Sequence, residues 1–117
     1  MPANARIFLA EDFPAVREAV RQLLANSGHT VILEAGTLQE ALEKTKQAQK
    51  NEVNVGLIDG SLSGGPSDGP KIAEALRKAV PGVKIVSFSG DSDVDWGDIN
   101  PGKNNIAKIG DIITNLH

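Results

Sequence analysis

A short apolar run near the start of the chain ends in two acidic residues: Arg6-Ile7-Phe8-Leu9-Ala10-Glu11-Asp12. Such a run is typical of a strand that is buried on both faces, as strands are in a parallel sheet. Pro14, just after the acidic pair, suits the first turn of a helix. The apolar residues that follow repeat at the spacing of one helical face, at Val16, Val20, Leu23 and Leu24. The pattern predicts a strand followed directly by a helix, with Gly28 as its C-cap.

The same alternation of strand and helix continues along the chain. Apolar runs predict strands at 30–35, 53–58 and 83–88, and helical spacing predicts helices at 37–50, 72–80 and 106–116. A short fifth strand is expected at 96–100. Strands that alternate with helices imply βαβ units with right-handed crossovers. The predicted fold class is therefore α/β, with a doubly wound parallel sheet of five strands.

Polar residues stand where the first, third and fourth predicted strands end. Glu11 and Asp12 follow the first strand, Asp59 the third and Ser89 the fourth. In a doubly wound sheet these strands are neighbours, and functional groups collect at their carboxyl ends. Carboxylates this close repel, so a cation or a shifted protonation must hold them, and hard oxygen ligands suit Mg²⁺. Taken singly, Asp12 could instead cap the first helix and Asp59 could begin a turn.

Composition excludes several classes of protein. The 117 residues include no cysteine, and the formal net charge is −3. Without a thiol the chain has no disulfide scaffold, thiolate metal site or cysteine nucleophile. Without a cluster of basic residues we expect no nucleic-acid partner, and without a long apolar run we expect no membrane partner. The chain is expected to be one domain over 1–117 and cytoplasmic. His29 and His117 are expected to face solvent.

The pattern as a whole resembles the receiver domain of two-component response regulators. The resemblance covers nearly the whole chain and rests on Ile7-Phe8-Leu9-Ala10-Glu11-Asp12, Leu57-Ile58-Asp59, Asp68-Gly69, Pro81 and Ile85-Val86-Ser87-Phe88-Ser89-Gly90. It implies the flavodoxin-like receiver fold with strand order 2-1-3-4-5, in a single receiver domain without an output domain. It also implies a signalling module whose own chemistry is limited to Mg-dependent self-phosphorylation and autodephosphorylation.

The resemblance implies a role for each of the polar residues at the strand ends. Asp59 would accept a phosphoryl group from a sensor histidine kinase or a phosphotransfer protein. Asp12 would bind Mg²⁺ directly, Glu11 mainly through water, and the backbone carbonyl of Ser61 would be a further ligand. Ser89 would hydrogen-bond the phosphoryl group and carry the switch to a downstream protein, whose identity the sequence does not give.

The family also places a lysine at the end of the fifth strand, where its ammonium meets the phosphate. Lys103 is the predicted residue, because it directly precedes two Asn that can cap the last helix. The competing interpretation of Lys103 is an exposed loop lysine. Lys108 is the alternative candidate, although it would lie inside the last helix and on its solvent face.

The segment after Ser89 departs from the family pattern. Fourteen positions separate Ser89 from Lys103, which is too few for a full helix and a strand. The fourth helix of the family is therefore predicted to be reduced or missing. Trp96 is the nearest aromatic residue to the expected switch position in the fifth strand, and a hydrophobic plug is the simpler interpretation of it.

Two other functions fit parts of the sequence. A pseudo-receiver would keep the fold and act as a phosphorylation-independent protein-docking module, as the shortened segment after Ser89 favours. A phosphatase with an Asp nucleophile would need a second acid two residues after Asp59, but Ser61 stands there. The complete set of strand-end residues favours the phosphoacceptor.

Overall fold

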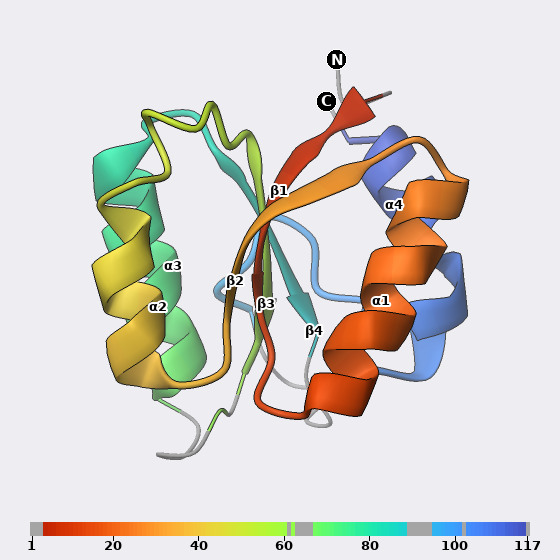
Figure 1. Cartoon of the computed structure of the whole chain (residues 1–117), viewed down its shortest axis with the longest axis horizontal. Coiled ribbons are helices and arrows are strands. Elements are labelled where there is room, and N and C mark those ends of the chain that lie inside the picture. Colours follow the sequence, from red (N-terminus) through yellow and green to blue (C-terminus); the bar gives the residue numbers. More distant parts are fainter. Residues whose placement is uncertain (1–3, 61, 63–66, 89–94, 102, 117) are drawn as a thin grey trace.

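The computed structural model of the chain describes residues 4–60, 62, 67–88, 95–101 and 103–116, without the side chains of 103 and 104. Strands and helices alternate along it (Figure 1). In chain order they are β1 (Arg6–Ala10), α1 (Pro14–Asn26), β2 (Thr30–Ala35), α2 (Leu38–Thr45), β3 (Val55–Asp59), α3 (Asp68–Ala79), β4 (Lys84–Phe88), the 3-10 helix η2 (Lys103–Lys108) and α4 (Ile109–Thr114). No helix of this part of the chain is long and apolar enough to cross a membrane.

The four strands form one parallel sheet in the order β2-β1-β3-β4. Helices α1 and α4 cover one face of the sheet, and α2 and α3 cover the other (Figure 1). This three-layer arrangement is the expected α/β, flavodoxin-like fold. Ala10 pairs with Ile58, and Asp59 pairs with Phe88. Strands β1, β3 and β4 therefore end side by side at one edge of the sheet.

Successive residues of β1 enter two separate hydrophobic cores. Phe8 and Ala10 belong to the core beneath α2 and α3, whereas Ile7 and Leu9 belong to the core beneath α1 and α4. All four side chains are fully buried. Burying a large apolar side chain of this kind contributes about 1.5–3 kcal/mol to folding. Burial on both faces explains why the strand has a continuous apolar run rather than an alternating pattern.

Local sequence signals account for the ends of the first two helices. Pro14 occupies the first turn of α1, and Gly28, which follows the helix, has a φ of 86°. A glycine adopts this left-handed conformation without the steric cost that a Cβ brings. Helix α2 is capped by Thr37, whose hydroxyl oxygen accepts a hydrogen bond from the backbone N–H of Glu40 at 3.1 Å. The Glu40 carboxylate in turn accepts from Gly36 N at 2.7 Å, which completes a reciprocal capping arrangement.

Two helices are shorter than the sequence predicts. The helix predicted at 37–50 ends at Thr45, and turns follow it up to Glu52, which has a φ of 58°. Hydrogen bonds from the N–H of residue i to the carbonyl of residue i−3, such as Ala48 N to Thr45 O at 3.1 Å, replace the α-helical bonds to residue i−4 there. The helix predicted at 106–116 is divided into η2 and α4. Asn105, with a φ of −104°, interrupts the helical conformation within η2.

The predicted fifth strand at 96–100 is wrong for the described residues. This segment makes only an isolated parallel bridge, between Val86 and Ile99. The physical reason is that a side chain, and not the backbone of a fifth strand, accepts a hydrogen bond along the outer side of β4. The Asp98 carboxylate accepts the hydrogen bond of Ile85 N at 2.7 Å, where a neighbouring strand would place a carbonyl. Residues 95–101 contain no helix either, and residues 89–94 lie outside the described part of the chain.

Candidate functional site

Three carboxylates meet at the edge of the sheet where β1 and β3 end. One carboxylate oxygen from each of Glu11, Asp12 and Asp59 lies within 4.8 Å of the other two. Glu11 and Asp59 are buried, with exposed fractions of 0% and 1%, and Asp12 is partly buried. Two unit charges at such a separation repel by about 3 kcal/mol at an effective dielectric constant of about 20. A cation between ionised carboxylates at this separation would offset such repulsion.

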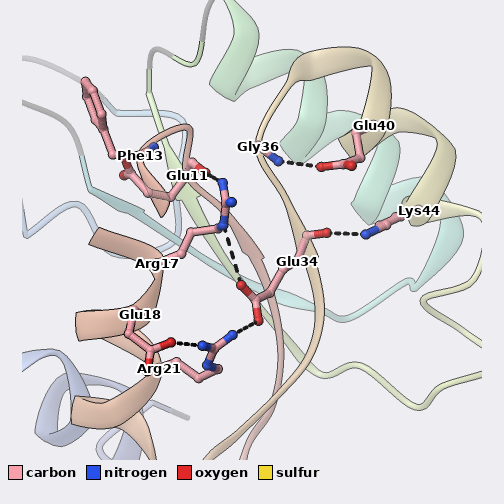
Figure 2. Close-up of polar contacts among 9 residues, drawn as sticks. All are labelled: Glu11, Phe13, Arg17, Glu18, Arg21, Glu34, Gly36, Glu40 and Lys44. Carbon is pink, nitrogen blue, oxygen red and sulfur yellow. Dashed lines mark hydrogen bonds and ion pairs between the residues drawn. The ribbon is translucent and has the colours of Figure 1, made fainter. Parts of the chain in front are cut away.

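Backbone and side-chain contacts fix Glu11 in place. Its N–H donates to the carbonyl of Ala35, the last residue of β2, at 3.0 Å. Its Oε1 accepts from the backbone N–H of Phe13 at 3.2 Å. Its own carbonyl oxygen accepts from the guanidinium of Arg17 at 2.7 Å (Figure 2). The sequence does not point to Arg17, because a bond from a side chain to a backbone carbonyl leaves no pattern in it.

Asp12 offers an unused ligand atom to the cluster. Its Oδ1 is shielded from solvent and has no hydrogen-bond partner among the described residues. Buried carboxylate oxygens are normally hydrogen-bonded, and an exception points to an absent partner such as water or an ion. Three clustered carboxylates with a free oxygen fit a hard divalent cation, and Mg²⁺ accepts a few carboxylates together with water. The residues present therefore fit the metal that the sequence predicts.

The backbone beyond Asp59 is held close to the start of α3. Gly69 N donates to the carbonyl of Gly60 at 3.2 Å. A Cβ built at Gly69 would lie 2.6 Å from the ring of Trp96 and 2.9 Å from the Cα of Gly60. Trp96 is half-buried and packs against the core beneath α2 and α3. Its ring therefore lies against Gly69 at the start of α3, close to the backbone that follows Asp59.

Several predicted site residues fall outside this cluster. Ser61 and Ser89 lie outside the described residues. Lys103 begins η2, but its side chain is not described. Lys108 is solvent-exposed at the junction of η2 and α4. The cluster of Glu11, Asp12 and Asp59 is the part of the predicted site that the described residues bring together.

One prediction about the histidines is wrong. His29 does not face solvent, because 3% of it is exposed and both ring nitrogens have partners. Nδ1 lies 3.0 Å from Ala5 N, and Nε2 lies 3.1 Å from Gly110 O and 2.9 Å from Thr114 Oγ1. These partners lie far away in the sequence, which is why spacing gave no sign of them. His117 lies outside the described residues.

The chain matches the family model for the response regulator receiver domain over residues 7–98. The chain belongs to this family. Receiver domains are in general signalling modules and not enzymes, and they typically bind Mg²⁺ through acidic residues. The cluster of Glu11, Asp12 and Asp59 supplies such residues in this chain. No match was found among curated proteins.

Solved structures share this receiver fold. A CheY-like receiver domain protein from Methanospirillum hungatei JF-1 is 23% identical with a TM-score of 0.73, and the match covers 94% of each chain. The receiver domain of the response regulator NarL from Mycobacterium tuberculosis is 23% identical with a TM-score of 0.68, over 97% of this chain and 98% of that one. The response regulator PhyR from Brucella abortus is 20% identical with a TM-score of 0.72, and the match covers 97% of this chain but 48% of PhyR. The chain thus spans about half the length of PhyR.

Proposed function

We propose that this receiver domain accepts a phosphoryl group on Asp59 in a Mg-dependent reaction and signals by a change of conformation. The observation that carries the proposal is the meeting of three carboxylate oxygens within 4.8 Å, with Asp59 at the end of β3 and the acidic pair at the end of β1. Asp59 is buried, so a phosphoryl group on it would change the contacts of the surrounding segments. The donor would be a sensor histidine kinase or a phosphotransfer protein, and the recipient of the signal would be a further protein.

The chemistry requires a nucleophile and compensation of charge. A carboxylate oxygen of Asp59 attacks the phosphorus, and an acyl phosphate forms as the bond from phosphorus to the donor breaks. The electron pair of the broken bond leaves with the donor atom, which is nitrogen in phosphohistidine and oxygen in acetyl phosphate. Bound Mg²⁺, held by Asp12, Asp59, the Ser61 carbonyl and, through water, Glu11, would neutralise charge on the transferred group.

The remaining site residues would act on the phosphoryl oxygens. The hydroxyl of Ser89 would donate a hydrogen bond to one of them and turn toward it as it does so. The Lys103 ammonium would supply the second positive charge, with Lys108 as the alternative. A hydroxyl that turns toward the phosphate would bias the neighbouring loop between two states, and this is the proposed output of the module.

A docking module that works without phosphorylation is the second candidate. It is favoured by the replacement of a regular fifth strand by the Val86–Ile99 bridge in the described residues, since this edge belongs to the surface on which receivers signal. Against it stands the acidic cluster. The two candidates differ in their response to Mg²⁺ and beryllofluoride, which mimics a phosphoryl group. A phosphoacceptor changes its Trp96 fluorescence or NMR shifts on titration, whereas a docking module does not.

Mass spectrometry of the intact protein tests the phosphoacceptor directly. With Mg²⁺ and acetyl phosphate, the wild-type protein should gain the mass of one phosphoryl group, and Asp59→Asn should gain none. Asp111→Asn is the matched control, because Asp111 is an exposed aspartate on α4 and the same charge is removed. An unchanged wild-type mass, or full phosphorylation of Asp59→Asn, would exclude the proposal.

A further inference from the structure

Arg17 lies between the acidic cluster and strand β2. From α1 its Nη1 donates to the carbonyl oxygen of Glu11 at 2.7 Å, and its Nε lies 3.6 Å from Oε1 of Glu34 on β2 (Figure 2). The side chain of Arg17 is 23% exposed, so most of it is withdrawn from water. A guanidinium is planar and offers donors in fixed directions, and a side chain with two such partners has little freedom left.

The carbonyl that Arg17 holds is the one that joins the two acids. It belongs to the peptide plane between Glu11 and Asp12, whose orientation determines where both side chains leave the backbone. On the other side of Glu11, its N–H is bonded to Ala35 O at 3.0 Å. The Arg17 bond therefore completes the restraint of this turn. Without the Arg17 bond the peptide plane could rotate. The side chain of Asp12, whose Oδ1 has no hydrogen-bond partner among the described residues, would then move with the plane.

The space for the guanidinium depends on the absence of a side chain at Gly36. A Cβ built at Gly36 would lie 2.7 Å from Nη1 of Arg17 and 3.8 Å from the carbonyl oxygen of Glu11. A methyl group there would push the end of the arginine side chain aside, which a flexible side chain allows without loss of the fold. The N–H of Gly36 that donates to Glu40 would be unaffected.

We propose that Arg17 is a positioning residue for the metal site: it sets the Glu11–Asp12 peptide so that both acids face the divalent cation. This inference rests on the proposed function, because it takes the cation of the receiver domain to be Mg²⁺. Residues that hold metal ligands without touching the metal typically change its affinity about 10- to 100-fold when they are removed. Arg17 acts in this way through the backbone of the acidic pair.

The charge of Arg17 and its positioning role predict opposite effects of its removal on the affinity for Mg²⁺. The guanidinium adds a positive charge near the cation site, so its removal would by charge alone strengthen the binding of Mg²⁺. If Arg17 acts by positioning, its removal weakens the binding. Arg21 provides the matched control, because it lies one turn further along α1 and pairs with Glu34 at 2.5 Å and also with Glu18. Figure 2 shows both of these pairs and no bond from Arg21 to Glu11.

The experiment is a Mg²⁺ titration by calorimetry, with Trp96 fluorescence as a second readout, on the wild type and three variants. We expect Arg17→Gln to weaken Mg²⁺ binding about tenfold. Gly36→Ala should also weaken Mg²⁺ binding, although it changes no charge. Arg21→Gln should bind Mg²⁺ as the wild type does or slightly more tightly. Circular dichroism and thermal unfolding without Mg²⁺ establish that each variant is folded.

The outcomes separate this inference from the proposed function. A wild-type protein that binds Mg²⁺, together with Arg17→Gln and Gly36→Ala that bind it equally well or better, overturns the positioning role alone. A wild-type protein that binds no Mg²⁺ overturns the proposed function, and the inference falls with it. If Arg17→Gln does not fold, Gly36→Ala decides, because it displaces the guanidinium and leaves every charge in place.

Discussion

At the scale of single residues, His29 joins three segments at the amino end of the sheet. Its Nδ1 accepts from the N–H of Ala5, so the ring proton is assigned to Nε2, beside Gly110 O and Thr114 Oγ1. Ala5 precedes β1, and the other two partners lie on α4. One imidazole ring thus connects the start of the sheet with the last helix. A helix of six residues has little stability of its own and depends on such contacts.

Replacement of His29 should therefore destabilise the fold, by an amount that depends on whether the new side chain offers an acceptor to the N–H of Ala5. His29→Leu leaves the buried N–H of Ala5 without a partner, and we expect a loss of about 2–3 kcal/mol in the free energy of unfolding. His29→Asn can keep an acceptor near Ala5 but loses the contacts to α4, so its loss should be smaller. Urea unfolding measures both. Equal stability of the wild type and His29→Leu would show that the hydrogen bonds contribute nothing.

The sequence predicts some site residues well and others not at all. Glu11, Asp12 and Asp59 could be placed together because the carboxyl ends of neighbouring parallel strands share one edge. Arg17 and His29 could not be placed, because each bonds to backbone groups, and such bonds leave no pattern in the sequence. An arginine on an amphipathic helix looks the same in sequence whether it faces water or a carbonyl. A helix-flanking histidine likewise gives no sign of its burial.

At the scale of elements, the segment 95–101 takes the place of a strand through one side-chain carboxylate and a few backbone hydrogen bonds. The Asp98 carboxylate accepts from Ile85 N at 2.7 Å, and Asp98 N donates to Ile85 O at 2.7 Å. Further along, Ser87 N donates to Ile99 O at 3.0 Å. These bonds satisfy the edge of β4 although the segment makes no regular ladder. The alternation of apolar residues cannot predict this, because the decisive group is a carboxylate that acts as a backbone carbonyl would.

Asp98 should consequently matter more than its exposed position suggests. Asp98→Ala removes the acceptor of Ile85 N, and we expect a loss of about 1–3 kcal/mol in the free energy of unfolding. Arg77→Gln is the matched control, because Arg77 contacts the same carboxylate at 3.5 Å across an exposed ion pair. Such pairs contribute about 0–1 kcal/mol. Urea unfolding with Trp96 fluorescence compares the two variants, and an equal loss in both would contradict the role of the Ile85 bond.

At the scale of the whole molecule, the two ends of the sheet differ in what holds them together. The amino end is closed by the hydrogen bonds of His29, whereas the carboxyl end holds three carboxylates whose charges repel when all are ionised. Such repulsion lowers the stability of the unliganded fold, which is common at functional sites. A ligand that binds only the folded chain raises stability by RT ln(1 + [L]/Kd), or about 2.7 kcal/mol at a hundredfold excess over Kd. The acidic edge should therefore make the stability of this receiver domain depend on Mg²⁺.

Thermal unfolding with EDTA and with Mg²⁺ separates two contributions at the acidic cluster: the repulsion among the carboxylates and the free energy of Mg²⁺ binding. In EDTA, Asp12→Asn removes one charge of the cluster, and we expect it to stabilise the fold by about 1–2 kcal/mol, below the full Coulomb term because Asp12 is partly exposed. In Mg²⁺ the order should reverse, because the wild type gains the binding free energy and the variant has lost a ligand. Asp111→Asn, which changes an exposed carboxylate on α4, should follow the wild type in both conditions. A variant that is more stable than the wild type in both solutions would mean that the cluster repels but binds no cation, and an equal stability in EDTA would mean that the three carboxylates do not repel at all.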